Sequence, residues 1–425
     1  MLTAIVILFF GLLVLGVPIA IMLLMVTTIS LYFFTQVPLV SLVQQLFSGL
    51  DNFVILAVPF FIVAGGIMAS GDSARRIVAV MNIIVGRLPG GLAISTVFAC
   101  MFFAAISGSS LATVVAIGTI MIPALINLGY PQKLSIGLVT SAGSLGVLIP
   151  PSIPMVLICV VMNTSVGEQF MAGFLPGIII GLCLSAYIYI LARRSNWGGT
   201  EKYTFSEAIR ILKEGSLALI LPLIVLGGIY GGFATPTEAA AVSLVYALIL
   251  ELGIYRKLKP KNLTKVVVDS AVISSALTLI LTGAFAFNWV LTMQRVPVLA
   301  ANFITTYIGS KWLFLLILNV FLIIMGCFVE LISLIMVIGP ILVPTLELYR
   351  INLIHFGIIM VVNAEVGYMT PPFGLNLFVA MGITKQTLWE IARAVFPFML
   401  IFAGCLFVFT YIPQISTILP DLFLH

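Results

Sequence analysis

Hydroxyl groups, glycines and prolines gather at two places where the sequence is otherwise apolar. In the first, residues 107–110 read SGSS, and residues 141–151 read SAGSLGVLIPP. Proline removes a backbone donor and breaks a helix, so carbonyl groups before Pro150 lose their partners. Unpaired carbonyls are costly in hydrocarbon, and with serine hydroxyls they offer the oxygen ligands that hard cations prefer. This chemistry indicates a sodium site.

The second place repeats the first at a fixed distance along the chain. The motif IGxIxxPxL begins at Ile117 and again at Ile338, a shift of 221 residues (338 − 117). The motif GxxxPP begins at Gly146 and at Gly367, which is the same shift. Two motifs in one register indicate an internal duplication.

The duplicated units carry different side chains at equivalent positions. Glu330 is in register with Ser109, and Glu365 is in register with Ser144, because both pairs are 221 residues apart (330 − 109 and 365 − 144). Each copy therefore pairs a polar turn with a proline break. This is the pattern of inverted-repeat transporters, in which half-helix ends meet near the membrane midplane.

These residues also have structural interpretations. Ser107, Ser109 and Ser110 could ease close helix packing, and the proline pairs could be kinks. Glu330 and Glu365 could cap helices near an interface. However, an acidic side chain at membrane depth is costly and normally faces a polar cavity or a partner. The recurrence of the proline pair with its glycine favours a site.

The elements that hold these residues must lie in a membrane. The chain of 425 residues is 62% hydrophobic and 8% charged, against roughly 45–50% and about 25% in soluble domains. The net charge of +5 could indicate nucleic acid. The basic residues, however, separate long apolar segments without forming an aromatic-rich basic face. We therefore expect a lipid bilayer as the surroundings and no nucleic acid.

Catalytic motifs are missing from the sequence. It contains no HExxH, DDxxD or P-loop motif, its five cysteines form no CxxC pair, and it has only two histidines. Enzymatic activity, a disulfide framework and a zinc site are therefore not expected. Without a nucleotide-binding motif, an ion gradient must supply the energy, and sodium coupling ions are the only cofactor expected.

The hydropathy pattern predicts about nine membrane-spanning helices and two re-entrant hairpins. The hairpins are expected at 91–128 and 312–346, each with a small or polar cluster near its middle. The spans are expected at 3–33, 52–70, 134–163, 166–192, 216–233, 236–255, 267–293, 353–382 and 389–416. Proline breaks should interrupt 134–163 and 353–382.

Lys and Arg residues predict the orientation of the chain. They cluster at 75–87, 193–213 and 256–265, and we place all three clusters in the cytoplasm. The number of spans between clusters then requires the hairpins to open to opposite sides. A segment starting at Lys257 mixes cations with apolar residues and could begin as an interfacial helix.

At these motifs the sequence resembles the large membrane subunit of tripartite ATP-independent periplasmic (TRAP) transporters, the DctM-like family. The resemblance covers essentially the whole chain. The matching stretches are LGVPIA at 15–20, VPFFIVAGGIMASG at 58–71, SGSSLATVVAIGTIMIPAL at 107–125, GVLIPPSIPM at 146–155, TPTEAAAV at 235–242 and GYMTPPFGLNLF at 367–378.

The resemblance implies an all-α integral membrane protein with an inverted-repeat, elevator-type transporter fold, two re-entrant helical hairpins and two discontinuous helices. It implies scaffold helices of the first repeat at 1–90 and a first transport-domain half at 91–163. A connecting helix and the second scaffold follow at 164–310, the second transport-domain half at 311–382, and a C-terminal helix at 383–425.

Carried over from the family, the resemblance also implies site residues. It implies one sodium site of Ser107, Gly108, Ser109, Gly143 and Gly146, and a second of Gly326, Val329, Glu330, Gly367 and Thr370. Neighbours of the substrate would be Ser110, Ser152, Asn363 and Asn376. None of these side chains is a cation, so sodium ions and helix amino termini would have to supply positive potential for an anion.

The family resemblance further implies partners. A small four-helix membrane subunit, expected here as a separate polypeptide, and a periplasmic substrate-binding protein would act with this chain in a bacterial inner membrane. The cargo would be an organic anion such as a dicarboxylate, a sialic acid or a related sugar acid. A gated ion channel with re-entrant loops is the main alternative, and a non-transporting scaffold subunit is a third.

Overall fold

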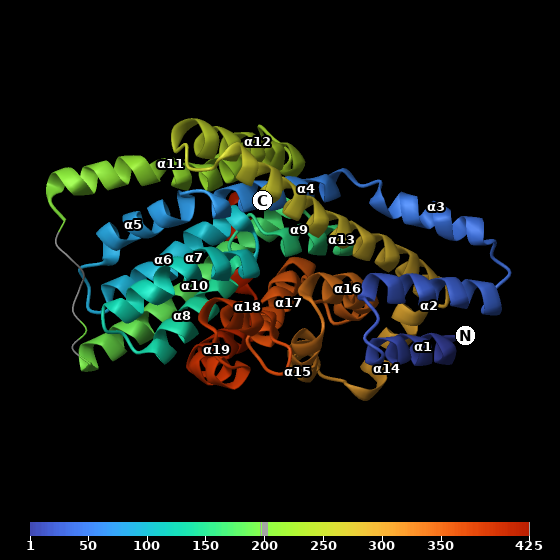
Figure 1. The fold of residues 1–425 in the computed structure, drawn as a ribbon. Helices are drawn as coiled ribbons and strands as arrows, with labels where there is room; N and C mark the ends of the chain where they lie inside the picture. Colours follow the sequence, from blue (N-terminus) through green and yellow to red (C-terminus); the bar gives the residue numbers. More distant parts are fainter. Residues whose placement is uncertain (196, 198–202, 425) are drawn as a thin grey trace.

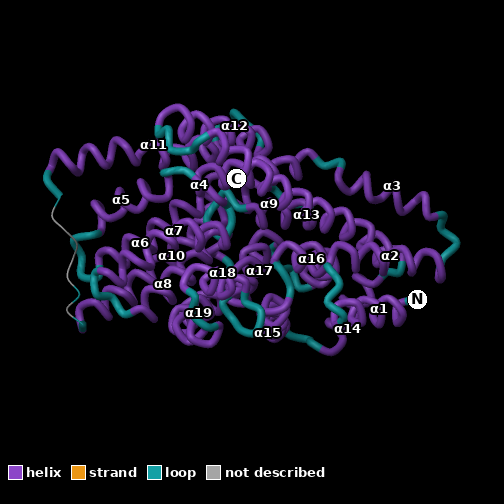
Figure 2. Tube along the Cα trace, viewed as in Figure 1, coloured by secondary structure: helices purple, strands orange, loops and turns teal. Residues whose placement is uncertain are grey.

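The computed structural model describes residues 1–195, 197 and 203–424, and its regular elements there are all helices (Figure 1 and Figure 2). Lys202, in the second basic cluster, lies outside the described residues. The all-α fold predicted from the sequence is confirmed. The helices are α1 (Leu2–Val14), α2 (Ile19–Phe34), α3 (Leu39–Leu50), η1 (Phe53–Leu56), α4 (Ala57–Ser70), α5 (Ser73–Val85), α6 (Gly91–Ser107), α7 (Ser110–Asn127), α8 (Gln132–Gly143), η2 (Ser144–Val147), α9 (Ile153–Met162), α10 (Val166–Arg194), α11 (Phe205–Tyr230), α12 (Pro236–Leu248), η3 (Ile249–Ile254), α13 (Pro260–Met293), α14 (Val296–Tyr307), α15 (Lys311–Phe328), α16 (Leu331–Leu348), α17 (Leu353–Tyr368), α18 (Leu375–Thr384), α19 (Leu388–Tyr411) and α20 (Gln414–Phe423).

Within the described residues, 8 helices are long and apolar enough to cross a membrane, and these include arms of both hairpins. Most stretches expected as spans are continuous helices. The span expected at 389–416 is too long, because α19 ends at Tyr411 and α20 begins at Gln414. The stretches 3–33, 134–163 and 353–382 are each interrupted. The sequence analysis predicted the last two interruptions. It did not predict the first.

The expectation of a single helix over 3–33 is wrong because Gly16 and Pro18 end one helix and start another. Gly16 has a φ of +73°, and the amide of Val17 donates to the carbonyl of Leu12. This is the glycine-terminated helix end known as a Schellman motif. Pro18 then occupies the N-cap of α2, so two short helices replace the expected span.

Both expected hairpins and both broken helices are present. Hairpin 1 consists of α6 and α7, and hairpin 2 consists of α15 and α16. The first break separates α8 and η2 from α9, and the second separates α17 from α18. The proline pair in each break is joined by a cis peptide bond. The repeat inferred from sequence motifs therefore corresponds to a repeat of structure.

Four shorter helices outside the hairpins and breaks were not expected: α3, α5, α14 and α20. These helices are 10 to 13 residues long, and each has few buried residues or a polar face. They are therefore too short or too polar to be predicted as membrane spans from hydropathy. The segment beginning at Lys257 contains no separate interfacial helix, because α13 runs unbroken from Pro260 to Met293. It packs against α2, α3 and α4.

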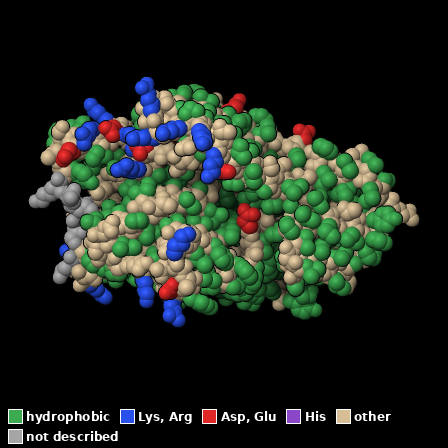
Figure 3. Space-filling model, in the orientation of Figure 1, with side chains coloured by type: hydrophobic (Ala, Val, Ile, Leu, Met, Phe, Trp, Pro, Cys, Tyr) green, Lys and Arg blue, Asp and Glu red, His purple; other side chains and the backbone are tan. Residues whose placement is uncertain are grey.

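Charge is unevenly distributed over the surface. On the face shown in Figure 3, the Lys and Arg side chains lie over the left half, around α5, α11 and α8. The right half, where α1–α3 lie, is mostly hydrophobic. An apolar surface of this extent fits contact with lipid.

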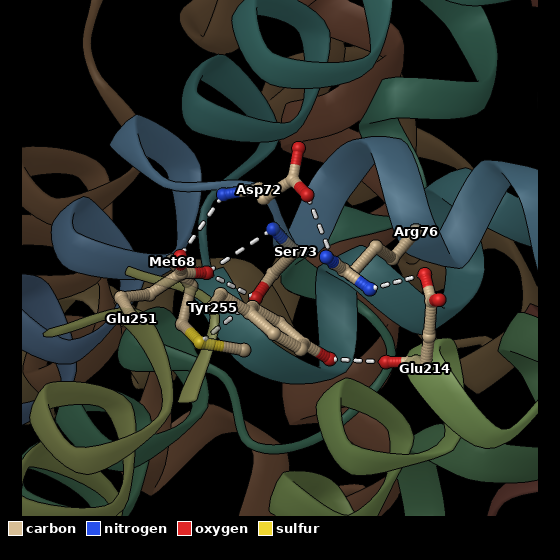
Figure 4. Close-up of polar contacts among 7 residues, drawn as sticks. All are labelled: Met68, Asp72, Ser73, Arg76, Glu214, Glu251 and Tyr255. Atoms are coloured by element: carbon tan, nitrogen blue, oxygen red, sulfur yellow. Dashed lines mark hydrogen bonds and ion pairs between the residues drawn. The ribbon is translucent and has the colours of Figure 1, made fainter. Parts of the chain in front are cut away.

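A polar network that is buried around Glu251 and reaches the surface at Glu214 joins α4, α5, α11 and η3 (Figure 4). The carboxylate of Glu251, in η3, accepts hydrogen bonds from the backbone amides of Asp72 and Ser73 at 3.0 and 3.1 Å, and from the Ser73 hydroxyl. Arg76 pairs with Asp72 and Glu214. Glu251 thus satisfies the free amides at the start of α5 and fixes these helices together.

Helix α12 begins as its sequence suggests. In the TPTE segment at 235–238, Thr235 accepts a hydrogen bond from the Glu238 amide, and the Glu238 carboxylate accepts one from the Thr235 amide. This reciprocal arrangement is a capping box. These capping hydrogen bonds explain the TPTE segment by a structural role alone.

Candidate functional site

The tips of the two hairpins line one cavity of about 470 Å³. The starts of α7, α9 and α16, together with Tyr368 at the end of α17, contribute to its wall, and α4 and α13 supply the rest. The hydroxyl and carboxyl groups on its lining residues belong to Ser70, Ser107, Ser109, Ser110, Asp269, Ser270, Glu330 and Tyr368.

The electrostatic character of this cavity follows from its lining. Asp269 and Glu330 contribute carboxyl groups, and no described lining residue is Lys or Arg. The other polar groups are hydroxyls, which offer oxygen atoms to a cation. The wall is mostly apolar, but its polar groups, two acids and six hydroxyls, suit a cation, whereas an anion would need compensating positive charge.

The first hairpin tip lies directly against the first break. The amide of Ile153 donates to the carbonyl of Gly108 at 3.4 Å. A Cβ atom on Gly146 would lie 2.6 Å from the carbonyl oxygen of Ser109, and one on Gly108 would lie 2.9 Å from the carbonyl oxygen of Pro151. Glycine is needed here because no side chain fits between the two backbones.

Hydroxyl groups at this tip point toward one another. Ser107 Oγ lies 3.0 Å from Thr113 Oγ1, and Thr113 Oγ1 donates to the Ser109 carbonyl at 2.8 Å. Ser109 Oγ accepts from the amide of Ala112 at 3.4 Å and so caps α7. The structure thus brings Ser107, Gly108, Ser109 and Gly146 together. Gly143 packs instead against Val114, in the second turn of α7.

The second break also lies directly against its hairpin, at Gly326 near the end of α15. A Cβ atom on Gly367 would lie 2.7 Å from Gly326 Cα, so α15 and α17 cross with backbones in contact. The hydroxyl of Tyr368 accepts a hydrogen bond from the amide of Leu331 at 2.7 Å. Tyr368 therefore fixes the start of α16, and the structure brings Gly326 and Gly367 together.

Val329, Glu330 and Thr370, the other residues expected in the second sodium site, have different surroundings. Val329 follows the last residue of α15, and Glu330 occupies the N-cap of α16 without a side-chain capping bond. Glu330 thus stands at the cap position but makes no capping hydrogen bond with its carboxylate, and it lines the cavity. The Thr370 hydroxyl donates to the Val366 carbonyl at 2.7 Å and lies 3.3 Å from Met399 Sδ.

Of the expected substrate neighbours, Ser110 lines the cavity. Ser152 is buried, with its hydroxyl donating to the Val147 carbonyl at 2.5 Å. Asn363 donates to Asn319 Oδ1 at 2.8 Å, which places it between α15 and α17. Asn376 is buried and donates to Ser144. Their roles in substrate binding stay predictions.

The structure adds residues to this site that the sequence analysis missed. Thr113 completes the hydroxyl group cluster of the first tip, and its spacing of four residues from Ser109 is a helical signal that was available. Asp269 is the only acid in α13 and lines the cavity. An acid within a long apolar helix marks a functional candidate. The sequence around Tyr368 contains no pattern that would have marked it as a site residue.

The sequence expectation for Glu365 is corrected by the structure. One interpretation of its side chain was a cap on a helix near an interface. Instead Glu365 is buried within α17, and its carboxylate accepts from Asn376 at 3.2 Å. The break between α17 and α18 turns α18 back toward α7 and α8, which brings Asn376 to Glu365.

Comparisons with known proteins place the chain in a family. Residues 6–415 match the model of the tripartite ATP-independent periplasmic transporter, DctM component. The C4-dicarboxylate TRAP transporter large permease protein DctM of Pseudomonas aeruginosa is 42% identical over 381 residues, covering 90% of this chain and 89% of that protein. The isethionate TRAP transporter permease protein DctMQ of Oleidesulfovibrio alaskensis is 40% identical, covering 95% of this chain and 64% of that protein.

A solved structure shares the fold. The crystal structure of the YdaH transporter of Alcanivorax borkumensis, described as having an unusual topology, matches with a TM-score of 0.66 and 14% identity. The match covers 96% of this chain and 99% of that one. The predicted transporter fold is therefore confirmed. Because the family model spans nearly the whole sequence and the relatives are about 40% identical, this chain is a multi-pass membrane protein of the DctM component family of TRAP transporters.

Proposed function

We propose that this chain is the large permease subunit of a sodium-coupled importer of an organic anion. The observation that carries the proposal is the meeting of two hairpin tips and two broken helices at one cavity with hydroxyl and carboxylate groups. Sodium ions bound at the tips would neutralise Glu330 and Asp269. A negatively charged substrate could then enter a cavity that otherwise repels it.

Helix amino termini supply further positive potential. The first residues of α7, α9 and α16 line the cavity. Free amides at a helix start carry partial positive charge and bind anions. The first amides of α9 already donate to Gly108 and Ser152, so sodium ions and the amides of α7 and α16 would together hold a carboxylate without any Lys or Arg. In this way the site could bind an anion although none of its expected side chains is a cation.

Transport would proceed by an elevator motion. In this proposal, 91–163 and 311–382 form the moving unit, and α19 moves with it because it packs against α8 and α17. The remaining helices stay fixed in the bilayer. Gly65 of α4 lies against the backbone of Ser107, and a surface without side chains at this contact would favour sliding. Ions and substrate would travel with the hairpin tips, while the part of the cavity wall formed by α4 and α13 stays fixed.

The partners follow from the family. A periplasmic binding protein would deliver the substrate, and a small membrane subunit would complete the permease in a bacterial inner membrane. The DctMQ relative is longer than this chain, which covers 64% of it. Its name suggests that both subunits can be joined in one polypeptide. The two relatives named above carry different substrates in their names, so we leave the proposed cargo at the level of an organic anion.

Reconstitution tests the proposal. The permease is placed in proteoliposomes with its small subunit and binding protein, and uptake of labelled organic anions is measured while one component is omitted at a time. We expect uptake only when all components are present. A gated channel would instead pass current without the binding protein, and that result would replace the transporter interpretation.

A further inference from the structure

A second group of buried oxygen atoms lies within the packed interior of the same unit and adjoins the cavity at Ser110. Glu365 of α17 is 1% exposed, and Asn376 of α18 and Ser144 of η2 are 0% exposed. Asn376 Nδ2 donates to Ser144 Oγ at 2.8 Å and to Glu365 Oε2 at 3.2 Å. The hydroxyls of Ser110 and Ser144 also lie beside the Glu365 carboxylate. The group thus joins both breaks to the first hairpin.

Two oxygen atoms of this group have no hydrogen-bond partner. They are Glu365 Oε1 and Asn376 Oδ1, and both atoms are buried. Among the described residues, the ion pairs all involve Arg76, so no basic side chain neutralises Glu365. A buried carboxylate without a positive partner is strongly unfavourable. Some positively charged species must therefore accompany it.

The group occupies the place where the repeats meet. Ser144 and Glu365 are equivalent residues of the two copies, because they are 221 residues apart (365 − 144). Equivalent residues that lie together must be near the axis that relates the copies. One copy contributes a hydroxyl and the other a carboxylate, so the pair forms a single site rather than two.

From this geometry we infer that Glu365, Asn376, Ser144 and Ser110 form a sodium site between the repeats, distinct from the hairpin-tip sites. A cation contacts several oxygen atoms at once, so it would satisfy both unpaired oxygens. A proton on Glu365 is the alternative that would also remove the charge, and the experiment below separates the two. The bound ion would hold the two broken helices together.

Sodium binding to the purified permease tests the inference without transport. The full-length protein in nanodiscs is titrated with NaCl, with choline chloride keeping the ionic strength constant, and thermal unfolding is followed. Glu365→Gln keeps the shape of the side chain and removes its charge. We expect it to raise the sodium concentration for half-maximal stabilisation by about tenfold or more. An unchanged sodium dependence would overturn the inference.

Ser144→Ala gives an independent test if Glu365→Gln fails to fold. It removes one hydroxyl oxygen beside the Glu365 carboxylate and leaves the charge in place, so sodium should bind more weakly. An unchanged sodium affinity would contradict the site, as would stabilisation that follows pH and not sodium. The identity of the ion rests on the proposed function. The inferred site and the proposed function can nevertheless fail separately, because binding here is measured without substrate, binding protein or gradient.

Discussion

Replacing Gly146 by alanine should separate the first hairpin from its broken helix. The added Cβ atom would lie 2.6 Å from the Ser109 carbonyl oxygen and 2.8 Å from the Ser109 carbonyl carbon and from Thr113 Oγ1. Two of these are backbone atoms, so the tip itself must move by several tenths of an ångström. The Ser109 carbonyl is one of the oxygens in the proposed sodium site.

The size of the effect follows from the cost of overpacking. Forcing extra carbon atoms into a packed site costs about 1–3 kcal/mol. If the sodium-bound arrangement bears this cost, the sodium concentration for half-maximal uptake rises by roughly 5- to 150-fold. The assay is initial uptake in proteoliposomes as sodium is varied, with protein quality checked by size-exclusion chromatography.

Gly382→Ala is the matched control. It makes the same chemical change in α18 of the same unit, where a Cβ atom meets nothing within 4 Å. We expect its sodium dependence to equal that of the original protein. A monodisperse Gly146→Ala variant with unaltered sodium dependence would refute the assignment of the tip and break to an ion site.

Further predictions address the other parts of the account. Ser109→Ala should weaken sodium dependence by roughly tenfold without lowering protein abundance; loss of abundance with normal sodium dependence would return this serine to a packing role. Glu251→Ala leaves the amides of Asp72 and Ser73 without an acceptor, so it should destabilise the protein by about 1–3 kcal/mol. A thermal-unfolding curve no different from that of the exposed control Asp421→Ala would contradict this. Cysteines at Ser206 and Lys261, which are exposed positions in or near the basic clusters, should react only with reagents on the cytoplasmic side. Labelling of either from the periplasm would disprove the proposed orientation.

The hairpins and breaks could be predicted because their signals are local. The motifs beginning at Gly146 and Gly367 combine proline pairs with a repeated register, and each combination marks a break. The separation of α1 from α2 also had a local signal, since Gly16 and Pro18 stand at the junction. It was missed because the apolar run continues across them.

Long-range contacts could not be predicted in the same way. Asp269 reaches the cavity only because α13 packs beside α4. Asn376 meets Glu365 only because the second break turns α18 back toward the first repeat. Such contacts depend on how the helices pack against one another. This packing cannot be inferred from the residue types or their spacing along one helix.

The proposed transport requires a sodium gradient to drive uptake through this permease. Its most direct test is accumulation of substrate in proteoliposomes that contain the permease, the small subunit and the substrate-loaded binding protein. With sodium high outside, the account predicts accumulation above the external concentration, and collapse of that accumulation when a sodium ionophore dissipates the gradient. Equal accumulation with potassium in place of sodium, or accumulation that survives the ionophore, would contradict it.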